Sequence, residues 1–131
     1  MLAAVFRELD AELARLEARV GDEAVGLAEV LEPAIGLVAR LLRAWIALED
    51  GKTAPPAEAD VLEVWRSLVK GDPRWNAIRD NCRELVFYRN CLASGRSDAL
   101  PAVPQRMAVR TARHVWLYAR TRALREGRLA E

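Results

Sequence analysis

Residues 2–20, LAAVFRELDAELARLEARV, contain the strongest structural signal of this sequence. Their apolar residues recur at alternating intervals of four and three positions: Leu2, Phe6, Leu9, Leu13, Leu16 and Val20. This spacing puts them on one side of an α-helix, and it predicts a first helix that packs lengthwise against a neighbour. Gly21 ends the pattern.

The rest of the chain repeats this helical spacing between clusters of glycine, proline and aspartate. We expect further helices over 23–49, over a short segment that ends at Lys70, over 73–93, and from Pro104 onward. Pro33 lies inside the second of these and lacks an N–H group, which predicts a kink or break near it. No stretch alternates apolar and polar residues as a strand does. The sequence therefore predicts an all-α, single-domain bundle over residues 1–131, with five helices or with six if Pro33 breaks the second.

The composition is that of a globular domain: 131 residues are 52% hydrophobic and 30% charged. A chain of this length buries enough surface to fold without metal or disulfide cross-links. Charged residues follow the first apolar stretch at once, so no signal peptide is expected. The most apolar segment, 34–48, is interrupted by Arg40 and Arg43 and is too short to span a bilayer. We therefore expect a cytoplasmic protein without a membrane partner.

The two ends of the chain carry opposite net charges. Residues 1–32 hold three arginines and eight acids, whereas residues 104–131 hold seven arginines, two glutamates and the only histidine. Because eighteen arginines accompany only two lysines in the whole chain, part of this excess reflects composition rather than recognition. The polarity still indicates an interaction surface.

On a helical wheel, Arg106, Arg110, Arg113 and Arg120 fall within about 80° of one another. His114 and Arg128 lie alongside, and we call these six residues the arginine row: Arg106, Arg110, Arg113, His114, Arg120 and Arg128. The row could bind a phosphate backbone or an acidic protein surface. Alternatively, it could be a solvated face that pairs with acids of the first helix, within one subunit or across a dimer: Glu8, Glu12 and Glu17. The sequence leaves both interpretations open.

A second polar face is expected on the 73–93 helix, formed by Asn76, Arg79, Arg83 and Asn90. Phe87 lies near its edge, and such a mixture of amides, guanidinium groups and an aromatic ring can contact nucleic acid or a peptide. An ordinary exposed helix face has the same appearance. Another side of this helix carries Glu84 and Tyr88, for which a buried hydrogen-bond network is favoured over a ligand pocket.

The inventory for catalysis is small, with one histidine and two cysteines. The sequence contains no HExxH, paired CxxC, Walker-type or GxGxxG motif, so we expect no metal and no cofactor. Cys82 or Cys91 could act as a nucleophile with His114 as base. Cys82 belongs to an apolar stripe, however, where a cysteine is usually an inert small hydrophobe.

The arginines and histidine of the last helix resemble those of helical ribonucleases of the HEPN type, which carry an arginine, a short spacer and a histidine on a late helix. Here three residues separate Arg110 from His114 and seven separate Arg106 from it, and neither spacing matches that family. The small all-α subunits of CRISPR effector complexes are similar in size, helical class and basic helix faces. This architectural analogy implies nucleic-acid binding.

Three functions follow in order of expectation. The first is a non-catalytic interaction or assembly module that self-associates, with a dimer favoured. The second is nucleic-acid binding by the last helix, assisted by Arg79 and Arg83. The third is a small helical ribonuclease. The four tryptophans are expected to anchor the core or an interface: Trp45, Trp65, Trp75 and Trp116.

Overall fold

A computed structural model describes residues 2–22 and 24–129, and in this part the chain forms five α-helices, two 3₁₀ segments and no strand. In chain order these are α1 (Leu2–Arg19), α2 (Leu27–Ala47), α3 (Val61–Val69), η1 (Pro73–Ile78), α4 (Arg79–Ala93), η2 (Ser97–Ala99) and α5 (Pro104–Arg125). The predicted all-α bundle of five helices is confirmed.

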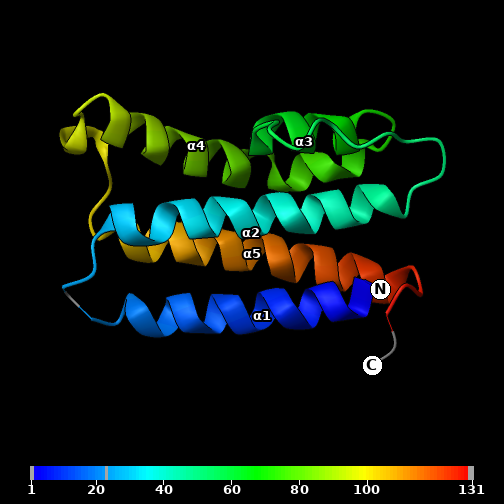
Figure 1. The fold of residues 1–131 in the computed structure, drawn as a ribbon, viewed down its shortest axis with the longest axis horizontal. Coiled ribbons are helices and arrows are strands. Elements are labelled where there is room, and N and C mark those ends of the chain that lie inside the picture. Colours follow the sequence, from blue (N-terminus) through cyan, green and yellow to red (C-terminus); the bar gives the residue numbers. More distant parts are fainter. Residues whose placement is uncertain (1, 23, 130–131) are drawn as a thin grey trace.

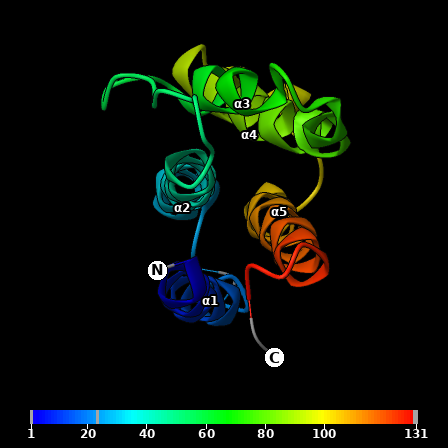
Figure 2. The ribbon, with the colours of Figure 1, turned by 90° about the vertical axis from the view of Figure 1, so that its right-hand side faces the viewer.

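The helices form three layers, which Figure 2 shows almost end on. One layer is α1, the middle layer is α2 with α5, and the third is α3 with α4. Figure 1 shows that α1 runs opposite to α2 and α5. Because α2 contacts all four other α-helices, it is the central element of the bundle. One side of α5 is left uncovered between α1 and α4 (Figure 2).

The core contains the residues that the helical spacing selects. All six apolar residues of the 2–20 pattern are buried. The four tryptophans are also buried, and the rings of Trp45 and Trp75 meet edge to face with centroids 5.0 Å apart. The indole of Trp116 donates to the carbonyl of Phe6 at 3.1 Å. The tryptophans therefore tie α1, α2, η1 and α5 to one core.

Pro33 does not break α2, which runs without interruption through it. The six-helix alternative is therefore wrong. Pro33 is exposed, as is Glu29, whose carbonyl loses its helical donor to the proline. Water can satisfy that carbonyl, while the neighbouring Leu31 and Ala34 are buried and hold both halves of the helix in the core. The helix also begins later than expected, after Gly26, whose N–H donates to the Glu29 carboxylate at 2.8 Å.

The 73–93 segment begins at Pro73 as expected, but its first six residues form the 3₁₀ helix η1 before α4 starts. The carboxylate of Asp72 accepts the N–H of Arg74 at 3.2 Å and so caps the start. Because 3₁₀ winding has three residues per turn, Asn76 does not share the register of α4. None of the described helices is long and apolar enough to cross a membrane.

Candidate anion-binding surface

Arg113 is the one member of the arginine row that acids of α1 cover. Its Nη1 lies 2.7 Å from Asp10, and its Nη2 and Nε lie 2.8 and 3.0 Å from Glu17. The guanidinium also lies 5.0 Å from the ring centroid of Trp116. The hydrogen bonds that Arg113 donates to Glu17 raise the pKa of Arg113. Arg113 therefore joins α5 to α1 and is not available to a partner.

The other two acids of α1 face a different arginine. Glu8 and Glu12 both pair with Arg40 of α2, the former at 3.6 Å. Glu17 lies across from the row as expected, but Glu8 and Glu12 do not. All four carboxylates of α1 are thus in ion pairs within the chain, and none of them pairs with the rest of the row.

The exposed side of α5 carries a regular series of residues at intervals of four, four, three, four and four. We call it the outer stripe: Arg106, Arg110, His114, Leu117, Thr121 and Arg125. Arg106 donates to the carbonyl of Val20 at 3.1 Å, whereas Arg110 and Arg125 make no ion pair in the described part of the chain. At 1.5 Å per residue, successive members four positions apart lie about 6 Å apart along the helix.

Arg120 and Arg128 lie off the outer stripe. Arg120 turns toward α1, where it lines a hollow with Phe6 and Asp10, and its guanidinium lies 5.8 Å from the ring centroid of Trp116. Arg128 follows the end of α5 and pairs with Glu126 and Glu49 at 3.3 and 3.5 Å. The row predicted as one face is therefore three groups, of which only Arg106, Arg110 and His114 belong to the stripe.

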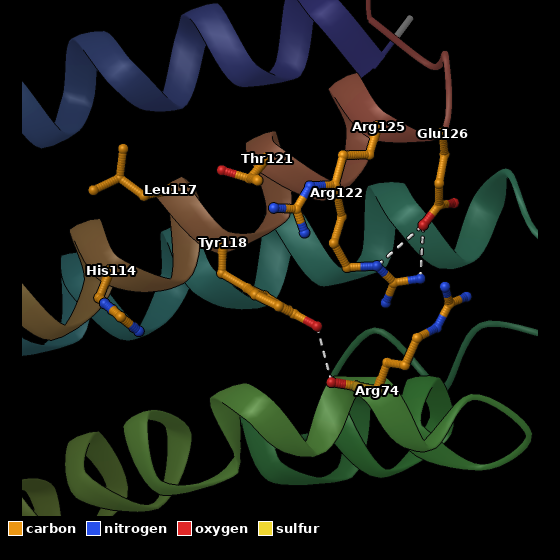
Figure 3. A pocket seen from close by; sticks show the side chains of 8 residues that line it. All are labelled: Arg74, His114, Leu117, Tyr118, Thr121, Arg122, Arg125 and Glu126. Carbon is orange, nitrogen blue, oxygen red and sulfur yellow. Dashed lines mark hydrogen bonds and ion pairs between the residues drawn. The ribbon is translucent and has the colours of Figure 1, made fainter.

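Two hollows follow the outer stripe. One, of about 460 Å³, is lined by Arg106, Arg110 and the paired Arg113, among others. The second, of about 720 Å³, lies at the other half of α5, and Figure 3 shows its eight lining side chains. His114 and Leu117 line both hollows. The stripe is therefore the floor of a groove that extends along most of α5.

The second polar face is only partly assembled. Arg79 pairs with its neighbour Asp80 at 3.3 Å. Arg83 and Asn90 are exposed on α4, and Phe87 beside them is 48% exposed. Asn76 is exposed on η1, off the register of the other three. Arg83 and Phe87 line a hollow of about 490 Å³ with Met107 of α5, which brings this face close to the start of the outer stripe.

The polar side chains on the inner side of α4 form the expected internal contacts. The hydroxyl of Thr111 donates to the carboxylate of Glu84. Tyr88 is buried, and burial together with the nearby Glu84 raises its pKa to about 12. The Thr111–Glu84 hydrogen bond therefore links α5 to α4.

Sequence reasoning missed Arg122, the most buried charged residue of α5, which is 6% exposed. Its guanidinium lies 4.5 Å from the ring centroid of Trp75 and 5.4 Å from that of Trp45. It pairs with Asp72 at 2.9 Å and with Glu126 at 2.8 Å. A signal for this existed, because Arg122 follows Ala119 by three positions and Glu126 follows it by four, which places it beside the apolar side with a carboxylate in reach.

The two candidate nucleophiles, Cys82 and Cys91, are both buried. Cys82 is fully buried, and burial raises its pKa to about 12, so the thiol stays protonated at neutral pH. His114 is exposed instead. Among residues 2–22 and 24–129, no three His, Cys, Asp or Glu side chains gather as a metal site requires.

Comparisons of the chain with protein-family models, with curated proteins and with solved structures found no match. We therefore infer its function from the geometry of the outer stripe and from the charges around it.

Proposed function

We propose that this protein is a non-catalytic helical interaction module, and that the outer stripe of α5 binds a polyanionic partner. The main support for this proposal is that all four carboxylates of α1 already form ion pairs within the chain, with Arg40 and Arg113. The positive charges of Arg106, Arg110 and Arg125 remain without a carboxylate partner in the described chain. An anionic partner would supply the missing charge.

Single-stranded nucleic acid is the partner class that fits this surface best. Arg106 and Arg110 lie about 6 Å apart along the helix, a spacing that suits successive phosphates of a polymer. A protein partner would need an apolar centre within its interface, whereas the stripe offers only Leu117. Guanidinium and imidazole planes can also stack on unpaired bases. Neutralised phosphates release counterions, which supplies the affinity.

The proposal is tested by measuring the affinity of a fluorescent single-stranded RNA as salt rises from about 50 to 200 mM. We expect the affinity to fall steeply and the salt slope to shrink by about 1–2 in an Arg106→Ala/Arg110→Ala variant. Arg120→Ala is the matched control, since Arg120 is exposed on the same helix but faces α1. Absence of RNA binding at low salt would defeat the proposal, and binding of an acidic peptide in its place would identify a protein partner.

Self-association is a second candidate because a separate apolar cluster is exposed beside the stripe. Phe87 and Val103 are 48% and 45% exposed, and Met107 lines the hollows next to both. Aromatic residues, methionine and arginine are the residue types enriched in protein interfaces, and Arg83 borders this cluster. Sedimentation should show a dimer that Phe87→Glu dissociates. A monomer at every concentration would exclude this candidate.

The ribonuclease expectation is tested in the same samples. RNA incubated with the protein should remain intact under the binding proposal. Degradation that His114→Ala abolishes would replace this proposal with a catalytic one.

A further inference from the structure

The larger of the two hollows is lined by side chains from outside the outer stripe as well as by members of the stripe. It lies between the C-terminal half of α5 and η1, and its volume of about 720 Å³ is typical of sites for small organic molecules. Tyr118 forms one wall. Its hydroxyl donates to the carbonyl of Arg74 at 2.9 Å, and its ring meets Trp75 edge to face at 5.5 Å. The tyrosine is therefore held in place before any ligand arrives.

We propose that this pocket binds a small organic anion, with its carboxylate or phosphate on Arg125 and its flat or apolar body against Leu117 and Tyr118. Leu117 is 49% exposed at the edge of the pocket, so about half of its side chain is open to a ligand. This inference does not depend on polyanion binding by Arg106 and Arg110.

The charge of the pocket supports an anionic ligand. Arg74, Arg122 and Arg125 bring three guanidinium groups to it. Two carboxylates neutralise part of this charge: Asp72 pairs with Arg74 and Arg122, and Glu126 pairs with Arg122. One positive charge is left over, on Arg125. Figure 3 shows the Arg125 side chain turned back along α5 toward Thr121 rather than away from the pocket. Its planar fork can bind a carboxylate or phosphate through two hydrogen bonds.

Arg122 provides a second, independent observation. Its side chain is only 7% exposed, yet its Nη1 has no hydrogen-bond partner in the described chain. An unpaired nitrogen on a buried guanidinium is costly and calls for an acceptor. Figure 3 shows this guanidinium between Glu126 and the side chain of Arg74. The Arg74 side chain beside it is 69% exposed.

The test is calorimetric titration of the full chain with three probes: benzoate, phenyl phosphate and a nucleoside monophosphate. We expect saturable binding at one site, and the ranking of the probes distinguishes a carboxylate ligand from a phosphate and a phenyl ring from a nucleoside. Arg125→Ala should weaken binding at least about tenfold, as expected for the loss of a bidentate ion pair. Arg120→Ala is the control and should leave the affinity unchanged.

Two further variants distinguish failure of the pocket proposal from failure of the polyanion proposal. Leu117→Asp keeps the helix surface exposed but adds a negative charge at the pocket, and it should abolish binding of every probe. Arg106→Ala/Arg110→Ala should keep the affinity for small anions even where it loses RNA. Failure of all three probes to bind at millimolar concentration would overturn the pocket proposal without affecting the polyanion proposal. Binding that Arg125→Ala and Arg120→Ala weaken equally would overturn it as well.

Discussion

Arg113 of α5 and Glu17 of α1 are joined by two hydrogen bonds of 2.8 and 3.0 Å, although they lie 96 positions apart in the sequence. The third nitrogen of the same guanidinium, Nη1, donates to the carboxylate of Asp10 at 2.7 Å. This contact divides the arginine row, because it commits Arg113 to the fold while Arg110, one turn earlier on α5, stays exposed.

Removal of the Arg113 side chain should therefore affect stability. We expect Arg113→Ala to lower the free energy of unfolding by about 1 kcal/mol, since it removes two partly buried ion pairs and a contact with Trp116. Arg110→Ala should change it by less than about 0.5 kcal/mol, as is usual for an exposed side chain without partners. Urea denaturation measures both. Equal losses in the two variants would show that Arg110 is also committed to the fold.

Asp72 should make stability depend on pH in acid. The Arg74 guanidinium, and then that of Arg122, lower the pKa of Asp72 from 3.8 to about 2. A carboxyl group with a lowered pKa stabilises the fold above its unfolded pKa, and this contribution is lost as the pH falls from about 4 to about 2. Asp72→Asn should reduce the free energy of unfolding at pH 7 by up to about 2 kcal/mol. It should also make the loss of stability between about pH 4 and pH 2 smaller than in the wild type. Asp50→Asn is the control, because Asp50 is exposed and makes no ion pair in the described chain. It should change neither the stability at pH 7 nor its dependence on pH in acid.

Val103 should be a site of stored strain. It precedes α5 with φ of 49°, the only positive φ of a non-glycine residue in the described chain, and it is β-branched. Glycine adopts this conformation freely, so Val103→Gly should stabilise the protein by about 1 kcal/mol. Ala102→Gly is the control and should not stabilise it. An equal or lower melting temperature for Val103→Gly would show that side-chain contacts of the valine outweigh the strain.

Pro33 should cost stability even though it does not break α2. Pro33→Ala restores the N–H that can donate to the Glu29 carbonyl and removes the crowding of the preceding turn. We expect a gain of roughly 1–3 kcal/mol in thermal or urea denaturation, the usual cost of proline within a helix. An unchanged midpoint would indicate that water already satisfies Glu29 fully.

The fold could be predicted because its signals are local. The intervals from Leu2 to Val20 specify one side of a helix, and that side is the buried one. Pro33 shows the limit of this reasoning. The consequence of a proline depends on whether its side of the helix faces solvent, and that depends on the packing of α2 against its neighbours.

The candidate site could be predicted only in outline. The wheel placed Arg106, Arg110 and His114 together, but it also grouped Arg113, Arg120 and Arg128 with them, which the structure separates. It could not choose between Arg40 and the arginine row as partner of Glu8 and Glu12. That choice depends on where α2 lies relative to α1. The wheel gives Arg122 no role, because its position beside Trp45 and Trp75 depends on how α5 packs against α2 and η1.

The most direct test of the account compares Arg106/Arg110 with Arg113 in a single binding measurement. A fluorescent single-stranded RNA is titrated at about 50 mM salt with the wild-type protein, with Arg106→Ala/Arg110→Ala and with Arg113→Ala. We predict that the double variant loses affinity about tenfold or more, and that Arg113→Ala, at a temperature where it is folded, retains the wild-type affinity. A wild-type protein that does not bind RNA, or two variants weakened to the same extent, would contradict the division of the row into a structural and a binding part.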